Sequence, residues 1–212
     1  MRGLCGRLVV LALGLGAAAG HAAPISGRVT TPDGKPVANA VVFVQESSVT
    51  PGAASRSAIM DQIDKTFVPG LLPIVVGTRV HFPNHDQIQH HVYSFSRTKT
   101  FELPLYKGED AAPVLFDKVG VVKVGCNIHD WMSGIILVLP TPWFARTGED
   151  GAFTIDDVPE GKHSLVAWHE LGKQKPEDTA QSVQGGALAV RFTLALGPAR
   201  PRPAMHGTRR EP

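Results

Sequence analysis

Three metal-binding side-chain types are evenly spaced in the stretch VGCNIHDWMSG, where Cys126, His129 and Met132 stand three residues apart. Thiolate, imidazole and thioether groups together are donors that copper selects, because Cu(I) favours sulfur and Cu(II) favours nitrogen. A further imidazole is available upstream, from either His90 or His91. This combination of donors indicates a site for one copper ion.

Two other interpretations of Cys126 stay open on the sequence alone. Free cysteine is among the most buried residue types, so Cys126 could be a structural core residue. It could also be a nucleophile, which needs a base and an orienting group. His129 could serve as the base, but the sequence shows no third partner. The metal-ligand interpretation is favoured because histidines and a methionine accompany the thiol.

Residues 1–23 have the pattern of a secretory signal peptide. Arg2 and Arg7 precede an apolar run over residues 8–19, and small residues suited to cleavage follow. A transmembrane helix is the alternative, but the run is short and rich in Gly and Ala. We therefore expect export without stable membrane insertion. Cleavage would remove Cys5, the only other cysteine, and leave a single unpaired thiol in an oxidising compartment.

The net charge argues against nucleic acid as a partner. The 212-residue chain has a formal net charge of +2 at pH 7, and the two arginines of the signal segment account for it, since no acidic residue occurs there. The exported chain is therefore close to neutral, whereas nucleic-acid binding depends on basic side chains that neutralise phosphates. Because a glycine-rich phosphate loop and a paired-carboxylate motif are both missing from the sequence, nothing in it indicates an enzyme.

Strand patterns dominate the rest of the chain and predict an all-β fold. Short β-branched runs alternate with clusters of Gly, Pro and Asp, and no apolar stripe keeps helical spacing for three turns. The runs GVVKVGC and GIILVL enclose the cysteine stretch, so two strands are expected to position it. Residues 197–212 are rich in Pro, Gly, Ala and Arg, which predicts a mobile tail.

The first and last strand-rich segments, 24–46 and 143–196, resemble two halves of one carboxypeptidase regulatory-like domain. That family opens with G-x-V-x-x-x-x-G-x-P-V-x-x-A-x-V and continues with D-G-x-F-x-I and P-x-G-x-x-x-L. The matching residues are Gly27, Val29, Gly34, Pro36, Val37, Ala40, Val42, Asp150, Gly151, Phe153, Ile155, Pro159, Gly161 and Leu165. The resemblance implies a small β-sandwich that is discontinuous in sequence, with residues 47–142 between its halves.

The segment from about residue 59 to residue 139 is similar to the cupredoxins, the blue copper proteins. The shared pattern is C-x-x-H-x-x-M after a strand, with N-x-D-x-x-x-H upstream, and its spacing is closest to that of amicyanin. The resemblance implies a Greek-key sandwich over residues 47–142. It also implies a ligand set, with a weak axial methionine, that consists of His90, Cys126, His129 and Met132.

The cupredoxin resemblance also implies a function. The whole arrangement resembles plastocyanin-like proteins labelled as methylamine utilisation proteins, which are periplasmic. We therefore expect a periplasmic type 1 copper protein that passes single electrons between redox partners, such as a c-type cytochrome or a dehydrogenase. Catalysis is not expected, because the protein donors would leave no open metal position for a substrate. Copper storage or delivery, or binding without redox chemistry, is the alternative.

Strand alternation allows only one of His90 and His91 to face the site. Hydrophobic parity favours His91, because Tyr93 and Phe95 share its face and look like core residues. Spacing from Asn84 favours His90, which falls where the cupredoxin histidine falls. We expect His90 to be the ligand, since a β-bulge at the end of a strand can reset the alternation.

Overall fold

The computed structural model describes residues 22–45, 56–108 and 111–198. Most of the predicted signal peptide (1–21) and of the predicted mobile tail (199–212) lies outside these ranges. The described chain consists of strands and one short 3₁₀ turn, Pro176–Thr179, which confirms the predicted all-β class. Within these ranges, no helix has the length and apolar character needed to cross a membrane.

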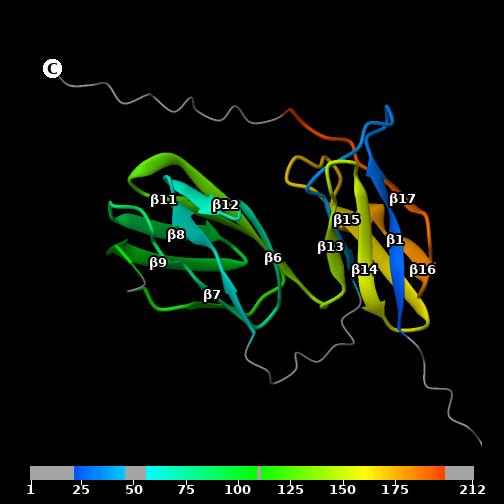
Figure 1. Ribbon diagram of the computed structural model, residues 1–212, viewed down its shortest axis with the longest axis horizontal. Coiled ribbons are helices and arrows are strands. Elements are labelled where there is room, and N and C mark those ends of the chain that lie inside the picture. The colour runs from blue at the N-terminus through cyan, green and yellow to red at the C-terminus, as the bar shows by residue number, and fades with distance from the viewer. Residues whose placement is uncertain (1–21, 46–55, 109–110, 199–212) are drawn as a thin grey trace, which may run out of the picture.

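Strands β3 to β12 form the unit that we call the central sandwich (Figure 1). One sheet has the order β6-β12-β11-β8-β9, a second has the order β10-β7-β3, and β4 and β5 form a hairpin. Buried side chains of both sheets, with those of the hairpin, make a single core. The strand bounds are β3 Ser57–Ile59, β4 Asp61–Ile63, β5 Thr66–Val68, β6 Leu71–Val75, β7 Thr78–His81, β8 His90–Ser96, β9 Lys99–Tyr106, β10 Val114–Phe116, β11 Gly120–Cys126 and β12 His129–Leu139.

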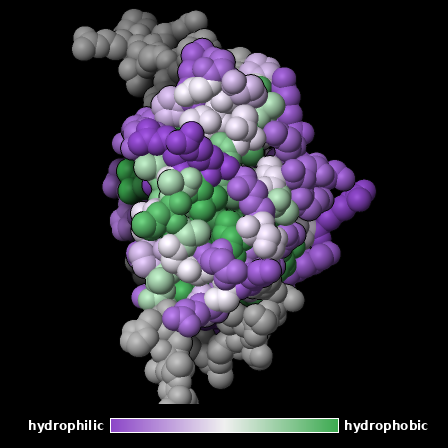
Figure 2. Space-filling model, turned by 90° about the vertical axis from the view of Figure 1, so that its right-hand side faces the viewer, coloured by the Kyte–Doolittle hydropathy of each residue, from purple (hydrophilic) through white to green (hydrophobic). Residues whose placement is uncertain are grey.

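Strands from both ends of the described chain form a second unit, the terminal sandwich. Strand β1 pairs with β14 and β17, and β2 pairs with β13 and β15, so segments on either side of the central sandwich share one core. On the face turned away from the central sandwich, apolar residues gather near the middle and hydrophilic residues surround them (Figure 2). The strand bounds are β1 Ala23–Thr30, β2 Val41–Val44, β13 Phe144–Arg146, β14 Ala152–Val158, β15 Lys162–Trp168, β16 Gln181–Gln184 and β17 Val190–Thr193.

A third apolar cluster joins the two sandwiches. Val41 and Phe43 on β2 and Val166 on β15 pack with Leu137 and Leu139 on β12. Alternate residues of β2 and β12 point instead into the cores of their own sandwiches. These strands are therefore buried on both faces, which explains why runs such as GIILVL are continuously apolar rather than alternating.

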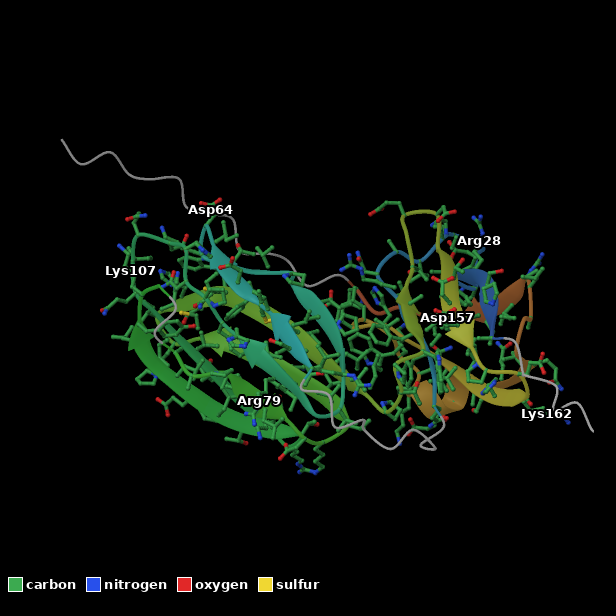
Figure 3. The ribbon with its side chains drawn as sticks, turned by 60° about the horizontal axis from the view of Figure 1, so that its bottom comes forward. Arg28, Asp64, Arg79, Lys107, Asp157 and Lys162 are labelled. Carbon is green, nitrogen blue, oxygen red and sulfur yellow. The ribbon has the colours of Figure 1, made fainter. Side chains whose placement is uncertain are left out.

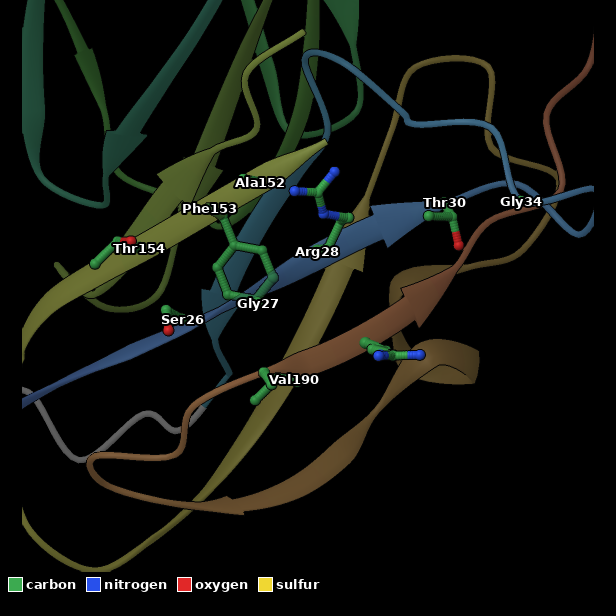
Figure 4. Close-up of a pocket in the computed structure, with 11 residues that line it drawn as sticks. Ser26, Gly27, Arg28, Thr30, Gly34, Ala152, Phe153, Thr154 and Val190 are labelled. Carbon is green, nitrogen blue, oxygen red and sulfur yellow. The ribbon is translucent and has the colours of Figure 1, made fainter. Parts of the chain in front are cut away.

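Gly27 marks a place where three strands of the terminal sandwich approach closely. A Cβ atom at Gly27 would lie 2.0 Å from the Val190 carbonyl oxygen and 2.8 Å from the Phe153 ring (Figure 4). We expect Gly27→Ala to lower the free energy of unfolding by about 1–3 kcal/mol, because the strands must move apart. Chemical denaturation measures this. The control is Gly70→Ala, since beyond its chain neighbours the nearest atom to its Cβ would be the Phe67 carbonyl oxygen at 3.9 Å. Equal stability of the two variants would contradict the prediction.

Two edge strands, β17 and β9, have backbone groups that are unable to pair with a further strand. On β17, the amide of Gln181 donates to the carbonyl of Arg191 at 2.7 Å, and the amide of Gln174 donates to that of Thr193 at 3.3 Å. On β9, which ends the five-stranded sheet, Pro104 has no N–H to offer. Both edges therefore expose fewer free backbone groups than an ordinary edge strand.

Candidate metal centre

The turn between β11 and β12 brings Cys126 and His129 together. Cys126 ends β11 and His129 begins β12, and the two residues face each other across an irregular step in the antiparallel register. The N–H of Asn127, within the turn, donates to the carbonyl of His91 at 3.1 Å. The turn is thus attached to β8, the strand that carries the paired histidines.

Three of the four predicted ligands converge on one point. The Nδ1 atom of His90 lies 3.6 Å from the Sγ of Cys126, and the Nδ1 of His129 lies 3.7 Å from the same sulfur. All three donor atoms lie within 4.8 Å of one another. Donors that share one ion at bond lengths of about 2.0–2.3 Å stand about 3–4 Å apart, so the cluster has the dimensions of a metal site.

Met132, the fourth predicted ligand, is buried in the same core as Cys126. Met132 lies on β12, the strand that also carries His129, and shares the buried core face with Cys126.

The structure turns His90 inward and His91 outward. His90 is fully buried, whereas the Nε2 of His91 pairs with the Glu102 carboxylate at 2.8 Å. The register between β8 and β9 shifts between His90 and Val92, but His90 shares the buried face of Val92 and Ser94, so the shift does not reset the alternation as expected. His91 therefore stands outside the cluster.

The parity argument for His91 was wrong because its aromatic neighbours are not core residues. Phe95 is 80% exposed, and Tyr93 packs beside it with ring centroids 5.0 Å apart. Tyr93 also lies over Gly125, whose missing side chain leaves room for the ring. Aromatic residues on this strand thus form a stack on the outer face of the sheet, while Val92 and Ser94 occupy the core face.

Trp131 covers one side of the cluster. From the sequence it could equally be a core residue or a shield beside His129. The structure shows it 47% exposed, with its ring centroid 5.2 Å from that of His129. Trp131 is therefore a surface residue that packs on a histidine of the cluster.

The electrostatic surroundings favour the neutral form of His129. Burial lowers the pKa of His129, the electrostatic effects of nearby His90 and Lys65 lower it further, and Asp86 opposes the shift only in part. Imidazole binds metals in its neutral form, so this shift favours binding. Lys65 belongs to the turn of the β4–β5 hairpin, beside Asp64, which lies at the upper edge of the central sandwich in Figure 3.

Asp86 is a site residue whose role the sequence did not reveal. Its Oδ2 atom lies 2.7 Å from the Nε2 of His90, the ring nitrogen that points away from the cluster. Burial raises the pKa of Asp86, but hydrogen bonds from His90 and from the N–H groups of Lys65 and Asp64 outweigh this and hold it below the ordinary value. The motif N-x-D-x-x-x-H was the available signal, but it does not say what the acidic side chain contacts.

No protein-family model matches the sequence, and no curated protein matches it significantly. Similar solved structures include a Cu-containing nitrite reductase from Thermus scotoductus SA-01 (27% identity, TM-score 0.38). They also include a purple cupredoxin from Nitrosopumilus maritimus (26%, TM-score 0.34) and an oxidized mutant of amicyanin (20%, TM-score 0.37).

The similar region covers less than half of this chain in each comparison. It covers 42%, 40% and 46% of the chain, in the same order. It corresponds to 24% of the nitrite reductase chain but to 99% of the purple cupredoxin and 97% of the amicyanin. The resemblance of the terminal sandwich to carboxypeptidase regulatory-like domains stays a prediction.

The donor set of the cluster fits copper. Two imidazoles and one thiolate, with a thioether beside them, are the donors of blue copper sites, where the methionine is a weak axial ligand. A purely structural cysteine would be expected among apolar atoms, whereas the sulfur of Cys126 is near two ring nitrogens. A nucleophile must reach its substrate, yet Cys126 is only 3% exposed.

Proposed function

We propose that this protein binds one copper ion through His90, Cys126 and His129, with Met132 as a weak axial ligand, and transfers single electrons between redox proteins in the periplasm. The observation that carries the proposal is the convergence of one buried sulfur and two ring nitrogens within 4.8 Å. Copper bound there would supply a one-electron couple between Cu(I) and Cu(II).

The placement of the donors suits electron transfer better than catalysis. His90, Cys126 and His129 lie on three neighbouring strands of one sheet, β8, β11 and β12, so hydrogen-bonded backbone holds them in place. The burial of His90 and Cys126 keeps water away from the sulfur. Metal-centred catalysis requires an open coordination position for the substrate. With Met132 as the fourth donor, the chain would leave no such position.

Trp131 and His129 provide a route from the cluster to the surface. His129 is only partly buried, and Trp131 packs on it while remaining 47% exposed. Ile128, in the same turn, is 48% exposed. A partner that docks against this turn would come close to a ligand without displacing the core. A c-type cytochrome or a dehydrogenase is the class of partner that we propose.

Copper loading tests the proposal directly. We expect the exported chain to bind one equivalent of copper and, when oxidized, to show the intense visible band of a thiolate-to-Cu(II) transition. Cys126→Ser should lose this band completely, because Cys126 is the free thiol of the described chain. Metal analysis and visible absorption spectroscopy measure both results. A colourless Cu(II) form, or undiminished copper binding by Cys126→Ser, would contradict the proposal.

Electron transfer is separated from copper storage by a kinetic measurement. A shuttle should show a reversible couple in voltammetry and rapid electron self-exchange between its Cu(I) and Cu(II) forms. A storage or delivery protein should instead release copper rapidly to a chelator or an acceptor protein. Slow self-exchange combined with rapid copper release would overturn the electron-transfer function and leave the copper site standing.

A further inference from the structure

The Asp86 carboxylate collects hydrogen bonds from three separate groups. Its Oδ1 atom accepts from the N–H of Asp64 at 2.7 Å, and its Oδ2 atom accepts from the N–H of Lys65 at 2.8 Å. The Oδ2 atom also lies 2.7 Å from the Nε2 of His90. One side chain therefore connects the β4–β5 hairpin to a proposed ligand.

The hairpin turn is shaped to make these bonds. Asp64 and Lys65 both have positive φ angles, 51° and 56°, as in the two-residue turns that connect antiparallel strands tightly. Their successive N–H groups both point at Asp86. The side chain of Asp86 is only 12% exposed, so its carboxylate has lost most of its contact with water. The two backbone N–H groups compensate for the lost water molecules by donating hydrogen bonds.

The contact with Asp86 determines which nitrogen of His90 faces the cluster. The Oδ2 atom of Asp86 already accepts a hydrogen bond from the N–H of Lys65, so in its contact with His90 the Nε2 is the donor and carries the proton. The Nδ1 of His90 is then the nitrogen with a free lone pair, and it is the one that lies 3.6 Å from the sulfur of Cys126. Partners of this kind fix the orientation of a ligand histidine and make it a stronger donor.

We propose that Asp86 is a positioning residue that fixes His90 for metal binding and lowers the reduction potential of the copper site. The inference rests on the proposed function and deepens it. A negative charge one imidazole away from the metal stabilises Cu(II), which has the higher charge, more than Cu(I). A more basic imidazole acts in the same direction.

A second acid–histidine pair in the same sandwich provides a matched control. The Asp61 carboxylate lies 2.8 Å from the Nδ1 of His85, but His85 is not part of the donor cluster. That pair is also more exposed, with 18% of the Asp61 side chain and 61% of the His85 side chain accessible. Removing the charge of Asp61 therefore changes the net charge of the protein by the same amount as removing that of Asp86, but it does not alter a contact with a proposed copper ligand.

The test compares the reduction potentials of copper-loaded wild type, Asp86→Asn and Asp61→Asn. We expect Asp86→Asn to raise the ratio of Cu(I) to Cu(II) affinity at least about tenfold, which is about 59 mV for one electron. Asp61→Asn should shift the potential much less, and Asp86→Glu, which keeps the charge, should stay nearer to wild type than Asp86→Asn. Equal shifts in the Asp86→Asn and Asp61→Asn variants would overturn the inference.

A second measurement on the wild type keeps the inference testable if Asp86→Asn does not fold. In the Cu(I) form, nuclear magnetic resonance should show a slowly exchanging proton on the Nε2 of His90, hydrogen-bonded to a carboxylate. Rapid exchange of that proton with solvent would overturn the inference even though copper is bound. A wild-type protein that binds no copper would instead overturn the proposed function itself, so the two failures are distinguishable.

Discussion

His90→Ala should abolish the visible copper band, whereas His91→Ala should leave it in place. His90 is fully buried with its Nδ1 atom 3.6 Å from the sulfur of Cys126, so its removal takes away a donor. His91 points away from the cluster and pairs with Glu102, which is 66% exposed. Losing such a pair should cost at most about 1 kcal/mol of stability. Visible absorption and electron paramagnetic resonance of the two copper-loaded variants measure the difference.

The two histidine variants also control for each other. They remove the same side chain from adjacent positions of β8, so a general loss of strand stability should affect both. Circular dichroism verifies that each variant is folded before copper is added. A lost band in His91→Ala together with a retained band in His90→Ala would transfer the ligand role to His91.

Leu139→Ala should lower the free energy of unfolding by about 2–5 kcal/mol. Leu139 is 1% exposed and belongs to the cluster between the two sandwiches, so truncation leaves a cavity at their junction. Chemical denaturation followed by circular dichroism measures the loss. The control is Leu188→Ala, because Leu188 is 72% exposed and its truncation should change stability by no more than about 0.5 kcal/mol.

The same cluster predicts how the unfolding transitions should be related. If the junction couples the sandwiches, tryptophan fluorescence and the visible copper band should report one transition in the wild type. Leu139→Ala should move both signals together. A variant in which only one signal moves would show that Leu139 supports a single sandwich. A loss of stability below about 1 kcal/mol would contradict the predicted cavity.

The all-β class could be predicted because short β-branched runs and turn residues are local signals. The continuous burial of β2 and β12 could not be predicted in the same way. A run such as GIILVL is apolar at every position, so it does not say which residues face which partner. The packing of one sandwich on the other determines which residues face which partner. Leu137 and Leu139 face the junction between the sandwiches, whereas Ile136 and Val138 face the core of the central sandwich.

The candidate site was visible in the sequence to the extent that its residues are close along the chain. Cys126, His129 and Met132 lie within one short stretch, so their types and spacing could be interpreted together. The choice between His90 and His91 was harder, because the aromatic neighbours on β8 belong to an exposed stack. The contacts of Asp86 with the hairpin turn could not be predicted, since they join positions about twenty residues apart and depend on the conformation of the turn.

The occupied carbonyls of β17 and the proline of β9 affect how readily a second copy of the chain can pair with these edge strands. A sheet edge with free N–H and C=O groups can recruit a strand from a second copy, and repeated addition produces fibres. On β17, two carbonyls are already occupied by glutamine amides of the same chain. On β9, Pro104 interrupts the row of donors. A strand of a second copy therefore finds fewer backbone partners along β17 and β9, which lowers the tendency of these two edges to extend their sheets.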